Sequence, residues 1–114
     1  MSPAARRPPD SAELGRLREE IDALDRRIVQ LLNDRARLTV EVGHEKTRLG
    51  RRAIRDAQRE REVLLRVSIV NEGPLPQADL IAIYRKLIAS ARALEARERA
   101  RAAGRDDDGE PPSA

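Results

Sequence analysis

Charged side chains interrupt the apolar stripe of a long predicted helix. Arg35 lies seven residues after Ile28 and three before Leu38, where the periodicity predicts an apolar residue. Lys46 follows eleven residues after Arg35, and at about 100° per residue the two cations project within roughly 20° of each other. Arg18 lies at the margin of the same stripe. These positions predict cations that face the interior of a helical domain.

Carboxylates occupy similar positions further along the chain. Asp56 and Glu60 share one face of a second predicted helix with apolar residues, and Arg59 lies beside them. In a third predicted helix, Glu95 lies four residues after Ala91, near the end of the apolar stripe. One buried pair would be weak evidence for function, because burying charge is costly and pairs also form in ordinary cores. Charges from three helices together indicate a polar cavity.

Such a cavity suits a small polyanion. Guanidinium groups pair bidentately with carboxylates, so Arg18, Arg35 and Arg59 suit a dicarboxylate, whereas Lys46 suits a single oxygen and the acids suit a hydroxyl. The chain has no cysteine and a single histidine, which argues against thiol chemistry and against a metal site. The residues alone therefore predict a dicarboxylate-binding site.

Three helices must position these side chains, and we expect an all-α fold. Apolar residues recur at three- and four-residue steps from about residue 11 to 49, again after the break at 50–52 as far as the Asn71-Glu72-Gly73-Pro74 turn, and a third time behind Pro76. The composition at both ends predicts a disordered segment over 1–10 and a disordered acidic tail over 101–114. Residues 11–100 would then form the domain.

The length of the first helix predicts a dimer. It would extend roughly 58 Å, while a globule of this chain length is only about 35 Å across. A single chain therefore cannot cover its apolar stripe. We expect two copies to form an intertwined homodimer around their long helices.

The charge balance argues against several other partners. The chain has 23 basic and 20 acidic residues, interleaved along the helices, with a net charge of +3. Interleaving is typical of a solvated surface rather than a nucleic-acid-binding stripe. No apolar stretch is long enough to span a membrane and no signal peptide is evident. We expect a cytoplasmic protein that binds neither nucleic acid nor membranes.

Two segments, LREEIDALDRRIVQLLNDRARLTVEVGHEK and IRDAQREREVL, resemble the AroQ-type (type II, all-helical) chorismate mutases. The family pattern is LR-x-x-I-D-x-x-D, then R, then G-x-x-K, then R-D-x-x-RE, and the resemblance covers about residues 14 to 95. It implies an isomerase that converts chorismate to prephenate by an intramolecular [3,3] (Claisen) rearrangement in the shikimate pathway to Phe and Tyr. Chorismate would be the substrate and no cofactor would be required.

The resemblance also implies roles for single residues. Arg18 would reach across the dimer and join Arg35 on one substrate carboxylate, while Arg59 helps to hold the other. Lys46 would bind the ether oxygen of the breaking bond together with Glu95, and the catalytic residues are therefore Lys46, Glu95 and Arg35. Asp56 and Glu60 would lie around the ring hydroxyl of the substrate. The full substrate-binding set is Arg18, Arg35, Val42, Lys46, Asp56, Arg59, Glu60, Val63, Ile88, Ala91 and Glu95.

Two positions depart from the family pattern. Ala91 stands where the family often has Ser, so one hydrogen bond to a carboxylate is missing. Glu95 stands where a Gln would donate to the ether oxygen, and a glutamate donates only when it is protonated. The resemblance thus predicts activity that rises toward mildly acidic pH.

Other functions are also consistent with the sequence. An isochorismate-pyruvate lyase or a 4-amino-4-deoxychorismate mutase would use the same scaffold, because carboxylates attract an amino group as well as a hydroxyl. A non-catalytic helical interaction module would explain length and charge, but not the charges on apolar faces. A shikimate-pathway enzyme is a further candidate partner.

Overall fold

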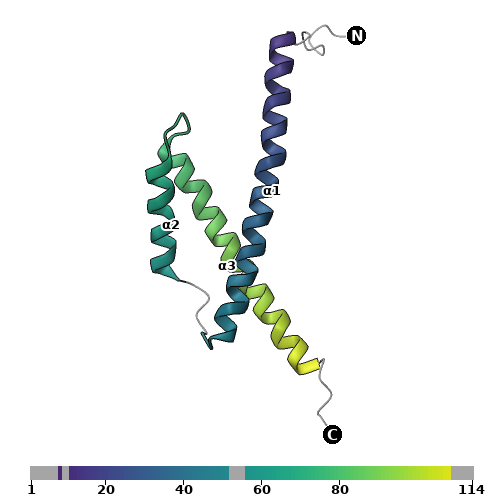
Figure 1. The fold of residues 1–114 in the computed structure, drawn as a ribbon, viewed down its shortest axis with the longest axis vertical. Helices are drawn as coiled ribbons and strands as arrows, with labels where there is room; N and C mark the ends of the chain where they lie inside the picture. The colour runs from purple at the N-terminus through teal and green to yellow at the C-terminus, as the bar shows by residue number, and fades with distance from the viewer. Residues whose placement is uncertain (1–7, 9–10, 52–55, 109–114) are drawn as a thin grey trace, which may run out of the picture. The chain divides into compact units, whose positions relative to one another are not determined.

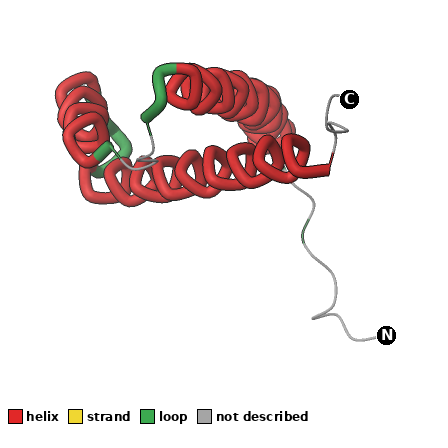
Figure 2. The backbone as a smooth tube through the Cα atoms, turned by 90° about the horizontal axis from the view of Figure 1, so that it is seen from below, coloured by secondary structure: helices red, strands yellow, loops and turns green. Residues whose placement is uncertain are grey.

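Three α-helices make up the fold. The computed structural model describes residues 8, 11–51 and 56–108, with side chains as far as residue 104. The helices are α1 (Ala12–Arg48), α2 (Ala57–Val70) and α3 (Gln77–Asp108), in that order along the chain (Figure 1). Within the described residues only helix and short connections occur (Figure 2). The predicted all-α fold of three helices with a very long first one is confirmed.

Capping residues mark both ends of α1. The Ser11 hydroxyl accepts a hydrogen bond from the Leu14 amide at 3.0 Å, which satisfies an amide that has no partner within the helix. At the other end Gly50 adopts a φ of 72°. Its amide donates to Thr47 at 3.0 Å and the next amide, of Arg51, donates to Lys46 at 2.8 Å. This pair of bonds is a Schellman motif, and its positive φ favours glycine.

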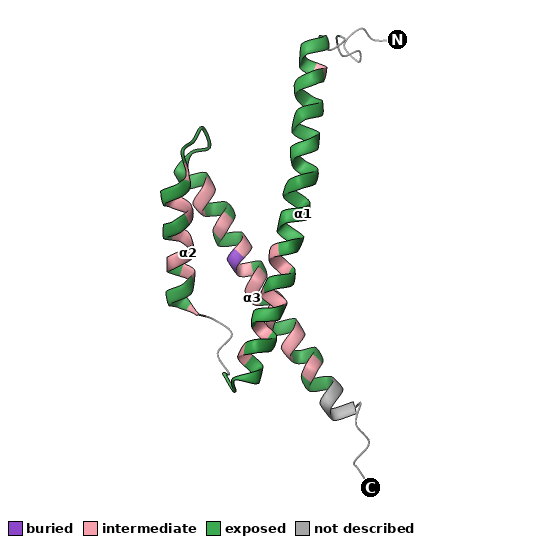
Figure 3. Cartoon of the chain, viewed as in Figure 1, coloured by how far each residue is buried: buried purple, intermediate pink, exposed green. Residues whose placement is uncertain are grey.

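The chain divides into two compact units, Met1–Arg35 and Ala36–Ala114. In the first unit, α1 is exposed on every side from residue 16 to 34 (Figure 3). Its exposed residues include large apolar side chains, among them Ile21 at 55% and Leu31 at 60%. A single chain therefore leaves this apolar stripe uncovered.

The second unit contains the apolar core. α2 packs on α3, and Ile88 of α3 is the most deeply covered residue, with 7% of its surface exposed. Neighbouring positions at helical spacing are half-buried on both helices: Val63, Leu64 and Val67 on α2, and Leu80, Tyr84, Leu87 and Ala91 on α3. This packing orients the faces that carry Glu60 and Glu95.

The end of α1 has two distinct faces in this unit. A half-buried face runs through Ala36, Thr39, Val40, Gly43 and Lys46. The larger apolar residues Leu38, Val42 and Leu49 lie elsewhere and are exposed. Small residues therefore line the face of α1 on which Lys46 lies.

A hydrogen-bonded turn joins α2 to α3. The Asn71 side-chain amide donates to the Leu75 carbonyl at 3.1 Å and to Gln77 Oε1 at 2.8 Å, and the Gln77 amide nitrogen donates to the Ser68 carbonyl at 2.9 Å. α3 then starts at Gln77, directly after Pro76. The turn predicted at Asn71–Pro74 is confirmed.

The length of α3 differs from the sequence-based expectation. We expected disorder from residue 101 onward, but the helix continues to Asp108. Arg101, Ala102 and Ala103 are strong helix formers and extend a helix that is already nucleated, so Gly104 does not stop it. Residues 1–7, 9–10 and 109–114, for which disorder was also expected, lie outside the described residues. None of the described helices is apolar over enough of its length to cross a bilayer.

Candidate functional site

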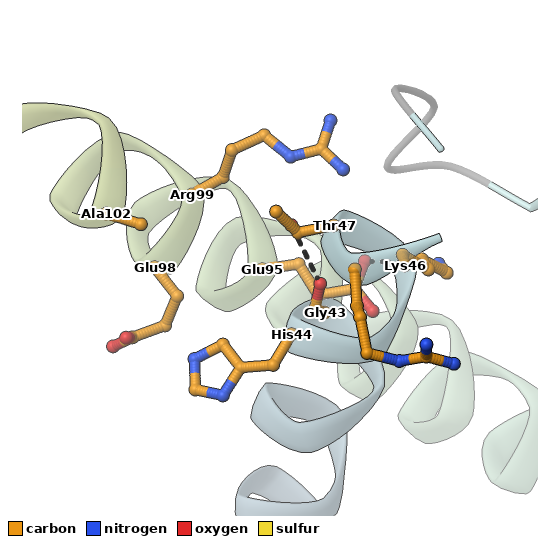
Figure 4. A pocket seen from close by; sticks show the side chains of 9 residues that line it. Gly43, His44, Lys46, Thr47, Glu95, Glu98, Arg99 and Ala102 are labelled. Carbon is orange, nitrogen blue, oxygen red and sulfur yellow. Dashed lines mark hydrogen bonds and ion pairs between the residues drawn. The ribbon is translucent and has the colours of Figure 1, made fainter. Parts of the chain in front are cut away.

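Lys46 and Glu95 meet where the end of α1 contacts α3. Lys46 Nζ lies 3.5 Å from Glu95 Oε2, and the two side chains are only 12% and 10% exposed (Figure 4). Gly43 faces the same contact, and a Cβ atom built on it would lie at an ordinary van der Waals distance of 3.5 Å from Glu95 Cγ. Two residues predicted for catalysis from different helices are thus in direct contact.

A second ion pair links α2 to α3. Glu60, predicted near a ring hydroxyl, lies with its Oε2 atom 3.4 Å from Arg92 Nε, and the side chains are 17% and 36% exposed. The Arg92 Nε atom is buried and makes no hydrogen bond among the described residues. Arg92 was not predicted from the sequence. Its only signal there is its position four residues after Ile88 in the third apolar stripe, on a helix that carries several arginines.

Asp56 has a structural role that was not predicted from the sequence. It is the N-cap of α2, and its Oδ1 atom accepts a hydrogen bond from the Arg59 amide at 3.0 Å. Its other oxygen lies 3.8 Å from the Arg51 guanidinium. Because the helix begins one residue later, Asp56 does not lie on an apolar helix face as predicted. A capping carboxylate at this place stabilises the helix and positions Arg59 and Glu60.

The other predicted site residues lie in varied environments. Arg59 is exposed, and its guanidinium is 3.7 Å from the Glu62 carboxylate. Of the apolar members of the predicted substrate-binding set, Ile88 is buried, Val63 and Ala91 are half-buried, and Val42 is exposed. Arg18 and Arg35 belong to the first unit, where Arg18 is exposed and Arg35 half-buried.

A pocket of about 340 Å³ opens beside the Lys46–Glu95 contact (Figure 4). Its lining comes from the end of α1 and the later turns of α3: Gly43, His44, Lys46, Thr47, Arg48, Glu95, Glu98, Arg99 and Ala102. Arg99 also donates a hydrogen bond from Nη2 to the Arg51 carbonyl at 2.9 Å. This bond ties Arg51, three residues after the end of α1, to α3.

The arrangement offers positioned charges rather than a nucleophile. A nearly covered lysine can bind an oxygen that becomes negative, and the carboxylates of Glu60 and Glu95 can accept or, when protonated, donate hydrogen bonds. These groups lie on packed helices, which restricts their movement. Such a site can stabilise charge that develops within a bound small molecule.

Comparison with known proteins gives a consistent result. Residues 17–96 match the family model of chorismate mutase type II, and this segment contains every residue of the predicted substrate-binding set. The bifunctional chorismate mutase/prephenate dehydratase of Aquifex aeolicus is 38% identical over 87 residues, which are 73% of this chain and 24% of that protein. The Escherichia coli protein of the same name is 49% identical over 51 residues, 45% of this chain and 13% of that protein.

A solved structure extends the comparison to the fold. The chorismate mutase of Thermus thermophilus superposes with a TM-score of 0.71 at 33% identity, over 75% of this chain and 96% of that one. The chain thus spans about a quarter of the length of the bifunctional relative from Aquifex aeolicus, but nearly the whole of the Thermus chain. Sequence and fold agree, and the chain belongs to the chorismate mutase type II family.

Proposed function

We propose that this chain is a cytoplasmic chorismate mutase that converts chorismate to prephenate for the synthesis of Phe and Tyr. The observation that carries the proposal is the contact of Lys46 with Glu95, 3.5 Å apart and nearly covered, in a chain of this family. A lysine held in such a position can meet an ether oxygen as its bond to carbon lengthens. The cytoplasmic location is supported by the biosynthetic activity in the names of the relatives.

The proposed reaction needs no covalent attachment to the protein. In the [3,3] rearrangement the ether C–O bond breaks while a C–C bond forms within the same molecule, so atoms and electrons balance without a proton transfer. The site contributes by selecting the folded conformer of the substrate and by stabilising charge on the ether oxygen. Arg35, with Arg18 and Arg59, would hold the two carboxylates, Lys46 and Glu95 would bind the ether oxygen, and Glu60 would accept from the ring hydroxyl.

The active form would be a homodimer with shared sites. The uncovered apolar stripe of α1 supports this, because leucine and isoleucine side chains gain roughly 1.5–3 kcal/mol each when they are buried. Packing against the same helix of a second copy would bury the stripe. Arg18, which is exposed in the single chain, would then contribute to the site of the partner.

The test is the loss of chorismate absorbance on adding the protein, with identification of the product. We expect prephenate from the wild type, and a decrease in kcat of about 10²–10³-fold for Lys46→Ala, the size seen when one preorganised charge-stabilising group is removed. Arg35→Ala should mainly raise KM. Lys86→Ala, which changes an exposed lysine on α3, serves as the matched control.

Other outcomes would redirect the proposal. Turnover of isochorismate or 4-amino-4-deoxychorismate in place of chorismate would keep the scaffold and replace the substrate. If none of the three compounds reacts and circular dichroism shows a folded dimer, the proposed activity is wrong.

A further inference from the structure

We propose that Arg92 is a specificity-determining residue, which makes the site prefer a substrate with a ring hydroxyl over one with an ammonium group at the same carbon. This inference rests on the proposed function, in which Glu60 contacts that ring substituent. The observation behind it is the ion pair between Glu60 and Arg92, with 3.4 Å between Oε2 and Nε.

The negative charge of Glu60 affects which ring substituent the site prefers. A carboxylate by itself attracts an ammonium group more strongly than a hydroxyl, because the ammonium carries a full positive charge. Glu60 is only 17% exposed, so water screens such an attraction weakly. A site that contained Glu60 without a nearby cation would therefore favour the amino-substituted compound.

Arg92 changes this balance without removing the acceptor. Its positive charge lies beside Glu60 and offsets the field of the carboxylate, and a second cation at this place would also be repelled by the guanidinium. The Arg92 Nε atom forms no hydrogen bond among the described residues, so this contact contributes charge without using a lone pair of Glu60. A carboxylate has about four lone-pair sites, and a hydroxyl can still donate to it.

The location of the pair fits this role. Arg92 lies next to Ala91, which belongs to the predicted substrate-binding set, and four residues after the buried Ile88, which anchors α3 in the core. Glu60 lies in the first turn of α2, directly after Arg59. Both partners are thus held by helices that pack on each other.

The test compares kcat/KM for chorismate and for 4-amino-4-deoxychorismate in the wild type and in two variants. Arg92→Gln removes one positive charge beside Glu60, so Glu60 should attract the ammonium more strongly than in the wild type. The chorismate preference should fall about tenfold, the effect of one charge interaction of ~1.4 kcal/mol. In Glu60→Gln the uncompensated Arg92 should repel the ammonium, and the preference should rise. The two variants each remove one partner of the ion pair, so the chorismate preference should change in opposite directions.

Two further variants separate charge from packing. Arg92→Lys keeps the charge and should retain most of the preference, whereas Arg97→Gln removes an exposed arginine of the same helix and should leave the ratio unchanged. Melting temperatures verify that each protein is folded. If Arg92→Gln does not fold, the Arg92→Lys and Glu60→Gln ratios still test the inference. A ratio within twofold of wild type in both Arg92→Gln and Glu60→Gln would overturn it.

Failure of the proposed function gives a separate signal. If the wild type turns over neither compound, that function is wrong, and calorimetric Kd values for the same two compounds then provide the ratio. The same shifts in the Kd ratio support the inference, an unchanged ratio overturns it, and the absence of binding overturns both proposals.

Discussion

Lys46 and Glu95 form an interhelical ion pair whose Nζ and Oε2 atoms lie 3.5 Å apart, with about nine-tenths of each side chain covered. The pair fixes the lysine on the half-buried face of α1. In the proposed function, a substrate oxygen would share Lys46 with this carboxylate. The negative charge of Glu95 would then reduce the positive charge that Lys46 offers to the substrate.

Replacing Glu95 by glutamine should raise the proposed activity. A glutamine side chain can donate a hydrogen bond to the ether oxygen, which an ionised glutamate cannot, and it leaves Lys46 its full charge. We therefore expect a higher kcat/KM for Glu95→Gln than for the wild type. The measurement is kcat/KM for chorismate at one fixed, near-neutral pH.

Glu45 provides the control for that substitution. It lies on α1 next to Lys46, is exposed, and the hydrogen bond from Arg48 holds the pKa of its carboxyl below the ordinary value. Glu45→Gln thus removes an ionised carboxylate that does not contact Glu95, and it should keep the wild-type kcat/KM. Equal kcat/KM values for Glu95→Gln and the wild type would show that Glu95 does not limit the charge that Lys46 offers.

A charge in the uncovered stripe of α1 should separate the dimer. Leu24 is 52% exposed in the single chain, and in the proposed dimer Leu24→Glu would bury an unpaired carboxylate, which costs several kcal/mol. Sedimentation should then show a monomer, and activity should be lost. Arg26→Glu alters the charge on another face of the same helix and should leave a dimer. A dimeric Leu24→Glu protein would show that the stripe is not the interface.

Mixing two inactive variants should restore activity if sites are shared. Arg18→Ala and Lys46→Ala change residues that, in the proposed dimer, reach the same site from different chains. A heterodimer would have one site with both changes and one with neither. Random reassociation after co-unfolding should therefore give about a quarter of the wild-type activity, whereas separate refolding gives almost none. Equal, negligible activity in both samples would place both residues in the site of one chain.

Asp56 variants should separate helix capping from substrate binding. Asn also accepts the hydrogen bond from the Arg59 amide, so Asp56→Asn should retain most of the stability, whereas Asp56→Ala should lose about 1 kcal/mol. Urea titration measures this difference. If the carboxylate also binds the ring hydroxyl, both variants should raise KM for chorismate. A KM that rises only in Asp56→Ala would mean that Asp56 acts through the helix alone.

Much of the fold could be predicted because its signals are local. Three-and-four periodicity, Gly50, the turn at Asn71–Pro74 and Pro76 each act within one or two helical turns. The same periodicity predicted Lys46 and Glu95 on covered faces, and both are indeed nearly covered. The extent of α3 was not predictable in this way, because helix propensity outweighed an acidic, glycine-containing composition that is typical of disorder.

The rest of the site depends on how helices cross. Arg92 resembles the exposed arginines around it, and only the packing of α3 on α2 brings it to Glu60. The capping role of Asp56 depended on a helix start that the sequence pattern located only to within a few residues. Those two residues were therefore missed or misplaced, although the helices that carry them were predicted.

The later turns of α3 have a consequence for inhibitor design. The segment that matches the family ends at residue 96, yet Glu98, Arg99 and Ala102 line the pocket beside Lys46 and Glu95. A compound that contacts Lys46 and extends toward Glu98 and Arg99 would therefore bind to two parts of the chain at once: the segment that matches the family and the turns of α3 that follow it. Its affinity would depend on both parts.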